Sequence, residues 1–353
     1  MEHDMTRADR RTRHRSEARQ FRLVALLLAT VALSVGCGQP QQDSAAADVI
    51  LIKFPHVMAP NTPKGRAAEY FKQAVETRLP GRVRVEVYPS GQLLDDDDSL
   101  DALAFGEVQM IAISLSKLDR LSHKYQVFDL PFLFADVHAV ERFQASAAGQ
   151  QLLDGLTDHG IQGLAFWHNG MKHMLGPRPM RRPEDAAGLR FRIQDSDVIQ
   201  EQILQIGGVP QKMAFGETYM ALQTGAVDAQ ENTWSNTFAS KFYEVQPYMT
   251  ETNHGYAGYM VAVNSAFWNG LPEPIRKELD AIVAETAVWA RQQSNAINEE
   301  SLAKVLATGK SQLVQLNDTE REAWQTAMQP VWAKFSDTIG ADLIQAARDA
   351  SRQ

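Results

Sequence analysis

Hydrophobic residues in the first part of the chain follow two spacings, one typical of strands and one typical of helices. Residues 49–54 (VILIKF) form a short apolar run, which predicts a buried strand. Residues 82–88 (RVRVEVY) place valine at every second position, which predicts a half-buried strand. Between these strands, apolar residues recur at helical spacing until Leu-Pro-Gly ends the helix: Ala68, Phe71, Val75 and Leu79.

The same alternation of strand and helix continues as far as residue 264. The pattern predicts further strands at 108–113, 161–167, 171–175, 189–193, 227–231 and 259–264. It predicts helices near 97–106, 137–155, 196–206 and 216–224. Strands that alternate with helices favour a largely parallel sheet covered by helices.

The last third of the chain is predicted to be helical. Residues 272–308 contain few helix breakers and predict one long helix, and residues 318–351 are helical as well. A length of 353 residues is enough for two domains with separate cores. We therefore predict two α/β domains with crossing connections, the long helix running across both, and a ligand site in the cleft between them.

The N-terminal segment has a different composition from the rest of the chain. Residues 1–22 carry seven arginines, and residues 23–35 form an apolar run that is short for a membrane span. This order of a basic and then an apolar segment predicts a secretory signal within residues 1–37. A single N-terminal transmembrane anchor is the alternative.

The apolar run ends at Gly36-Cys37, and Cys37 is the only cysteine of the chain. The sequence here resembles a bacterial lipoprotein signal, although Ser34 stands where leucine is usual. Because no second cysteine is present to form a disulfide, we predict lipid attachment at Cys37, with simple cleavage as the alternative. Residues 38–48 are small and polar, and they predict a flexible tether.

The charge of the chain limits its partners. The whole chain carries a net charge of −8; residues 1–37 contribute +3, so the remainder carries −11. An acidic surface argues against binding to nucleic acid. It also repels an anionic ligand at long range, so an anion would need a few local cations.

The sequence contains none of the common catalytic patterns. It has no GxSxG, Walker A, GxGxxG or HExxH motif, so no catalytic residue, cofactor or metal site is predicted. The histidines are scattered. The acidic run Asp95–Asp98 precedes a predicted helix, where acids favour the helix start; binding of a divalent cation is the alternative.

Arg192 is the most informative charged residue. In the predicted strand 189–193, three apolar side chains share one face, while Arg190 and Arg192 point to the other. An arginine near the end of a central strand projects into the predicted cleft, where its planar fork can hold a carboxylate. From the pattern alone, Arg192 is either a ligand anchor or part of a surface ion pair.

Residues 213–247 (MAFGETYMALQTGAVDAQENTWSNTFASKFYEVQP) carry the most specific signal in the chain. They resemble the signature of the solute-binding proteins of tripartite ATP-independent periplasmic (TRAP) transporters, in particular the C4-dicarboxylate-binding branch. Further segments resemble the same family: IKFPHVMAPNTPKGRAAE (52–69), VFDLPFLF (127–134), NGMK (169–172) and GLRFRIQ (188–194). The resemblance covers nearly all of residues 49–350.

This resemblance implies a two-domain periplasmic binding protein fold (Venus-flytrap) of the α/β class. Central sheets are flanked by helices, and the long helix crosses both domains. We expect domain I to contain residues 49–171 and about 258–290. We expect domain II to contain residues 172–257 and about 291–353.

The resemblance also implies the ligand contacts. Arg192 matches the arginine that forms the salt bridge to a ligand carboxylate, and Asn232 matches an asparagine that hydrogen-bonds the same group. Lys172 matches the position of a second cation, and its ammonium group is expected to make a looser contact than an arginine. Phe215 matches an apolar wall of the cleft.

Other implied contacts lie on nearby loops and helices. Ser114 and Ser116 follow a strand where members of the family vary their specificity contacts, and His56 and Val57 lie on the first strand-to-helix loop. The remaining expected contacts are Trp234, Asn236 and Tyr259. For Phe215, Trp234 and Tyr259, plain core packing is the alternative.

The function implied is that of a periplasmic solute-binding protein and not an enzyme. We expect a monomer that captures a small organic acid, in particular succinate, fumarate or malate, and delivers it to TRAP membrane subunits. A lipid anchor and the transporter are its expected contacts with a membrane. The alternatives are a sugar acid or 2-oxo acid as ligand, a ligand-presenting accessory to a sensor, an ABC-type binding protein, and an extracytoplasmic enzyme acting on carboxylic acids.

Overall fold

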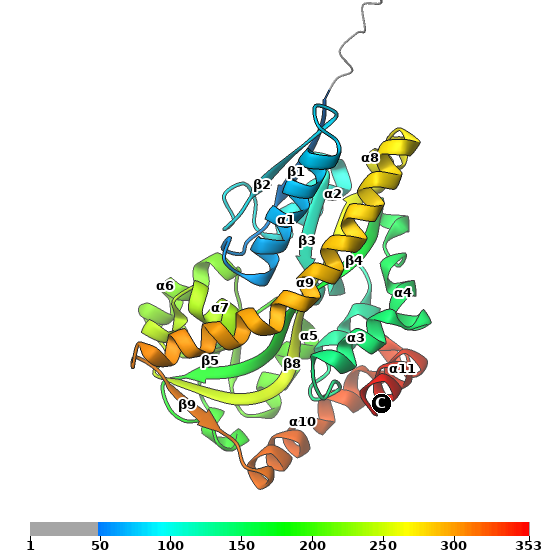
Figure 1. The fold of residues 1–353 in the computed structure, drawn as a ribbon. Helices are drawn as coiled ribbons and strands as arrows, with labels where there is room; N and C mark the ends of the chain where they lie inside the picture. The colour runs from blue at the N-terminus through cyan, green and yellow to red at the C-terminus, as the bar shows by residue number, and fades with distance from the viewer. Residues whose placement is uncertain (1–48, 353) are drawn as a thin grey trace, which may run out of the picture. The chain divides into compact units, whose positions relative to one another are not determined.

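The computed structural model describes residues 49–352 (Figure 1). The predicted signal within residues 1–37, the predicted lipidation at Cys37 and the predicted tether at 38–48 lie outside the described residues.

The described chain begins with a small parallel unit. Strands β1 (Ile50–Pro55) and β2 (Val83–Tyr88) pair in parallel and are connected by helix α1 (Pro63–Arg78). The helix begins where Thr62 accepts a hydrogen bond from the backbone N–H of Gly65, a typical N-cap. Both strands agree with their predicted positions within one residue, and α1 ends one residue before Leu79 but begins five residues before Ala68, the first predicted helical position.

A seven-stranded sheet forms the centre of the described chain. Its strands follow the order β3-β8-β4-β7-β5-β6, and β9 pairs with β8. Their bounds are β3 (Met110–Ser114), β4 (Ile161–Gly176), β5 (Arg190–Ile193), β6 (Val209–Lys212), β7 (Ala229–Asn232), β8 (Tyr248–Asn264) and β9 (Gln312–Gln315). Strands β6 and β9 were not predicted.

The predicted largely parallel sheet is wrong, because this sheet is mixed. Strand β8 is antiparallel to both β3 and β4, and β4 is antiparallel to β7. Only the pairs β5–β6, β5–β7 and β8–β9 are parallel within it. Strand β8 begins eleven residues before the predicted segment 259–264, and β4 joins the two predicted segments 161–167 and 171–175 into one strand.

Irregular pairing explains why the length of β4 was missed. The register between β4 and β8 shifts at Gly163/Ala165, at His168/Gly170 and at Lys172/Met174. Each bulge interrupts the regular alternation of side chains between the two faces. The pattern therefore indicated two strands, 161–167 and 171–175, where the structure has one continuous strand.

Helices surround the sheets. The α-helices after α1 are α2 (Asp96–Phe105), α3 (Val137–Ala145), α4 (Ala147–Leu153), α5 (Asp197–Gln205), α6 (Thr218–Gln223), α7 (Trp234–Ala239), α8 (Ser265–Gly270), α9 (Glu273–Ala307), α10 (Asp318–Ile339) and α11 (Ala341–Arg352). Short 3-10 helices are η1 (Leu115–Arg120), η2 (His123–Asp129), η3 (Thr157–His159), η4 (Pro183–Ala186), η5 (Phe215–Glu217) and η6 (Phe242–Glu244).

Two predicted helices are each divided in two. Ser146 ends α3 and caps α4, because its side-chain oxygen accepts a hydrogen bond from Gly149 N–H. Gly340 separates α10 from α11, and its φ of +103° is a conformation that favours glycine. The single predicted helix at 272–308 agrees with α9, which has 35 residues.

Helix α9 runs past both groups of elements that were predicted to form separate domains (Figure 1). Near its middle, the ring of Trp289 stacks on Tyr70 of α1, with 4.7 Å between ring centroids. Further along, Asn298 Oδ1 accepts a hydrogen bond from Ser235 N–H of α7 at 2.9 Å. The helix therefore contacts elements from both predicted domains.

Apolar side chains pack on both faces of the central strands. Along β8, Met260 and Ala262 join one hydrophobic cluster, which α3, α4 and α11 complete. Val261 and Val263 join another, which α1 and α9 complete. Both faces of the strands are covered, so the predicted α/β arrangement of sheets flanked by helices is confirmed.

Candidate functional site

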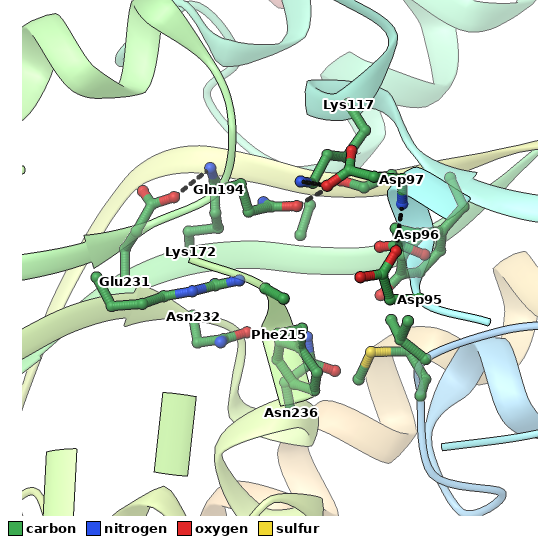
Figure 2. A pocket seen from close by; sticks show the side chains of 17 residues that line it. Asp95, Asp96, Asp97, Lys117, Lys172, Gln194, Phe215, Glu231, Asn232 and Asn236 are labelled. Atoms are coloured by element: carbon green, nitrogen blue, oxygen red, sulfur yellow. Dashed lines mark hydrogen bonds and ion pairs between the residues drawn. The ribbon is translucent and has the colours of Figure 1, made fainter. Parts of the chain in front are cut away.

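One pocket collects side chains from the ends of several strands and from the start of α2 (Figure 2). Strands β3, β5 and β7 end at it, and the long strands β4 and β8 pass it. Its lining consists of Val57, Met58, Asp95, Asp96, Asp97, Ser114, Lys117, Lys172, Arg192, Gln194, Ala214, Phe215, Glu231, Asn232, Asn236, Ala257 and Tyr259.

Arg192 lies at the pocket because of the alternation along β5. Phe191 and Ile193 are fully buried in the core, and Arg192 extends from the opposite face with an exposed fraction of only 4%. Its Nε and Nη2 atoms donate to the carbonyl oxygen of Met213 at 3.1 and 2.8 Å. The ring of Phe215 lies 5.7 Å from the guanidinium carbon.

The guanidinium of Arg192 is a buried cation without a close counter-ion. Within residues 49–352, no carboxylate oxygen lies within 4.0 Å of it. Burial lowers its pKa to about 10, so the group stays protonated at neutral pH. Arg190, two residues earlier, is instead the surface ion pair: its Nη2 lies 2.7 Å from Asp228 Oδ1.

Lys172 is held by acidic side chains. Its Nζ lies 2.6 Å from Glu231 Oε1 and 4.0 Å from Asp129 Oδ1. Glu231 Oε2 in turn lies 2.8 Å from His254 Nε2. Burial acts to raise the pKa of Glu231, but the charge of Lys172 and the hydrogen bond with His254 outweigh it, so the pKa is about 2. Lys172 therefore has an ionised partner of its own.

Asp129 is a second buried carboxylate beside Lys172. It accepts hydrogen bonds from Ser116 Oγ at 2.7 Å and from Ser196 Oγ at 2.8 Å. Burial raises its pKa to about 6, against the opposing effects of Lys172 and the two serines. The environment of Asp129 thus disfavours its ionised form.

We expect the stability of the protein to depend on the protonation of Asp129. Because the folded-state pKa is raised from 3.8 to about 6, the stabilising effect is complete below pH 4 and is lost as pH rises through 6. Between pH 4 and pH 7, the free energy of unfolding of the native protein should fall by about 2 kcal/mol more than that of Asp129→Asn. Urea denaturation at several pH values measures this difference.

Asp158→Asn is the control for this experiment, because Asp158 is exposed. That variant should follow the pH dependence of the native protein. If Asp129→Asn also followed it, the raised pKa of Asp129 would be wrong.

Amide side chains form another part of the lining. Asn232 Oδ1 accepts hydrogen bonds from Asn236 Nδ2 at 2.8 Å and from Thr233 N–H at 3.1 Å. Across the pocket, Ser114 Oγ donates to Gln194 Oε1 at 2.7 Å. That bond links the end of β3 to the residue that follows β5.

The start of α2 provides an acidic side of the pocket. Asp95 is the N-cap of α2 and accepts hydrogen bonds from Asp97 N–H and Asp98 N–H at 2.9 Å, so the acidic run marks a helix start. Lys117 Nζ lies 2.6 Å from Asp97 Oδ2. Within residues 49–352, no three histidine, cysteine or acidic side chains are grouped to hold a metal ion.

Residues 54–338 match the family model described as "Bacterial extracellular solute-binding protein, family 7". The chain belongs to this family. The family resemblance predicted from residues 213–247 is therefore confirmed. Proteins of this family bind solutes outside the cytoplasm, and the family is not a class of enzymes.

Relatives of this family 7 protein include the C4-dicarboxylate-binding periplasmic protein DctP of Shewanella loihica. The two are 47% identical over 296 residues, which cover 84% of this chain and 88% of the relative. A TRAP periplasmic solute binding protein from Shewanella oneidensis, solved with bound succinate, has a TM-score of 0.85 and 46% identity, covering 86% of this chain and 99% of that one. Another, from Pseudomonas aeruginosa PAO1 with bound L-malate, has a TM-score of 0.79 and 47% identity, covering 81% and 99%.

Most of the predicted contact residues of this solute-binding protein lie together at the pocket. They are Arg192, Lys172, Asn232, Phe215, Ser114, Val57, Asn236 and Tyr259. Three others do not line it. Ser116 bonds to Asp129, the Trp234 ring stacks on His173 at 3.7 Å, and His56 is buried with only 2% exposed.

Several residues that line the pocket of this family 7 protein were not predicted from the sequence. Gln194 directly follows the predicted strand 189–193, so its position was a usable signal. Lys117 carried no signal, because its partner Asp97 lies 20 residues away. Glu231 lies within the family segment 213–247 but was not singled out, because its partner Lys172 lies 59 residues away. Within residues 49–352, no helix has the length and apolarity needed to cross a membrane.

Proposed function

We propose that the protein captures a C4-dicarboxylate, such as succinate, fumarate or L-malate, in this pocket and delivers it to the membrane subunits of a TRAP transporter. The ligands bound to the similar solved proteins support this class of acid. The name of the S. loihica relative supports it as well.

The observation that carries the proposal is the state of Arg192. A guanidinium that is 4% exposed and has no carboxylate within 4.0 Å in the described chain carries a desolvation cost of several kcal/mol. Two of its nitrogens donate hydrogen bonds to the same acceptor, the carbonyl oxygen of Met213. A ligand carboxylate would supply the missing charge and could accept two hydrogen bonds from the planar group.

We propose that residues 49–171 with about 258–290, and residues 172–257 with about 291–353, form two domains that close on the ligand. The Ser114–Gln194 hydrogen bond joins segments from these two parts. A ligand that contacts both parts would favour the closed arrangement, because those contacts exist only when the parts are together.

The same proposal covers the export, membrane attachment and oligomeric state of the protein. The segment 1–37 would direct export, a lipid on Cys37 would tether the protein to the membrane, and the protein would act as a monomer. The acid is bound and released unchanged. After incubation of succinate with the purified protein, the NMR spectrum should therefore show succinate and no product.

Thermal unfolding with a panel of acids tests the proposal. At a concentration of 100 Kd, a ligand stabilises the folded protein by about 2.7 kcal/mol, which should raise Tm by about 4 °C for a protein of this size. Succinate, fumarate and L-malate should give this shift, and glucuronate and pyruvate should give less. A larger shift with a sugar acid or 2-oxo acid would replace the proposed ligand, and no shift with any acid would contradict the proposal.

A further inference from the structure

We propose that Lys117, and not Lys172, receives the second carboxylate of the ligand, and that Asp97 holds the Lys117 ammonium group until the ligand displaces it. This inference rests on the proposed function. It assigns the residue that distinguishes a dicarboxylate from a monocarboxylate.

Lys172 is poorly suited to this role because its partners are buried. Glu231, at 2.6 Å, has a side chain only 3% exposed, and Asp129, at 4.0 Å, is 1% exposed. If Lys172 turned to a ligand, water could not solvate the carboxylates that it left behind. Leaving a buried charge without its partner is strongly unfavourable, so Lys172 is expected to remain with Glu231.

Lys117 has a partner that can be released. Its side chain is 7% exposed, and its Nζ lies 2.6 Å from Asp97 Oδ2. The Asp97 side chain is 40% exposed, so water can solvate its carboxylate when the ion pair opens. Opening this ion pair therefore leaves no carboxylate buried without a partner. A ligand carboxylate can therefore replace Asp97 at low cost.

The position of Lys117 also suits a second contact. It lines the same pocket as Arg192 but belongs to η1, which follows β3, whereas Arg192 lies on β5. Figure 2 shows the Lys117–Asp97 pair and the Lys172–Glu231 pair as two separate contacts.

Lys64 is another buried lysine near this region, and its position excludes it as the residue that binds the second carboxylate. Its Nζ donates to the carbonyl oxygen of Ala112 at 3.0 Å and lies 4.0 Å from the centre of the Tyr259 ring. The Tyr259 ring lines the pocket, while Lys64 does not. Lys117 is thus the lysine of the lining whose counter-ion can be exchanged.

Calorimetry with succinate and succinamate tests the assignment, because the amide replaces one carboxylate without changing the length of the acid. The native protein should bind succinate at least tenfold more tightly than succinamate. In Lys117→Met the two affinities should differ by less than twofold. In Lys117→Arg the tenfold preference for succinate should be retained. In Lys172→Met the ratio should persist.

Asp97→Asn gives a prediction of opposite sign. Removing the charge that competes for Lys117 should increase the affinity for succinate severalfold, an effect that a purely structural role would not produce. Lys124→Met is the matched control, because Lys124 is exposed and does not line the pocket. It should leave both affinities unchanged.

The outcomes separate this inference from the proposed function. If the native protein binds succinate and Lys117→Met keeps the preference over succinamate, the assignment of Lys117 is overturned. It is also overturned if Lys172→Met, with a native circular dichroism spectrum, loses that preference. A native protein that binds no C4 diacid overturns the proposed function, and this inference with it.

Discussion

Replacing Arg192 with alanine is expected to weaken succinate binding at least about thirtyfold. The substitution removes the cation that has no counter-ion of its own among the described residues, and leaves a ligand carboxylate buried without a partner. Truncating one member of a buried charge pair costs about 2–5 kcal/mol, which corresponds to this loss of affinity or more. Isothermal titration calorimetry measures the effect directly.

Arg190→Ala is the matched control for this prediction. It removes the same side chain from the same strand, but Arg190 binds Asp228 and is not part of the pocket lining. Its affinity for succinate should stay within about twofold of the native value, because Arg190 does not line the pocket. Equal affinities of Arg192→Ala and Arg190→Ala would remove Arg192 from the proposed contacts.

The largest loss of stability is expected from Glu231→Ala. This change leaves the buried ammonium group of Lys172 without its partner at 2.6 Å, and leaves His254 without the contact at 2.8 Å. Breaking a buried ion pair in this way costs about 3–5 kcal/mol. The free energy of unfolding from urea denaturation at pH 7 should fall by this amount.

Two further variants separate lost charge pairing from lost packing. Glu299→Ala removes an exposed glutamate and should change the free energy of unfolding by less than about 0.5 kcal/mol. Glu231→Leu combined with Lys172→Met removes both charges and should recover much of the stability, because no unpaired ammonium remains. A double variant no more stable than Glu231→Ala would show that packing, and not charge, accounts for the loss.

The parts of the fold that depend on local sequence were predicted well. Helix α1 and strand β2 follow directly from their hydrophobic spacing, and α9 follows from a long stretch with few helix breakers. The direction of the strands was predicted wrongly. Whether β4 runs parallel or antiparallel to β8 depends on contacts between residues 161–176 and 248–264, which local periodicity does not report.

The candidate site divides in the same way. Alternation along 189–193 indicated that Arg192 and Arg190 share one face, but it could not say which of them is buried. The structure decides this: Asp228 comes close to Arg190, whereas Arg192 donates to the carbonyl oxygen of Met213 and lies near the ring of Phe215.

The sequence by itself determined the family, most of the succession of helices and strands, and the presence of two cations at positions 172 and 192. Only the tertiary structure decided which cation has its own counter-ion. Glu231 meets Lys172 through the pairing of β4 with β7, and Asp97 meets Lys117 through the approach of α2 to η1. These partners are distant in sequence, and an ion pair depends on separation in space. The charge available to a ligand is therefore a property of the folded protein.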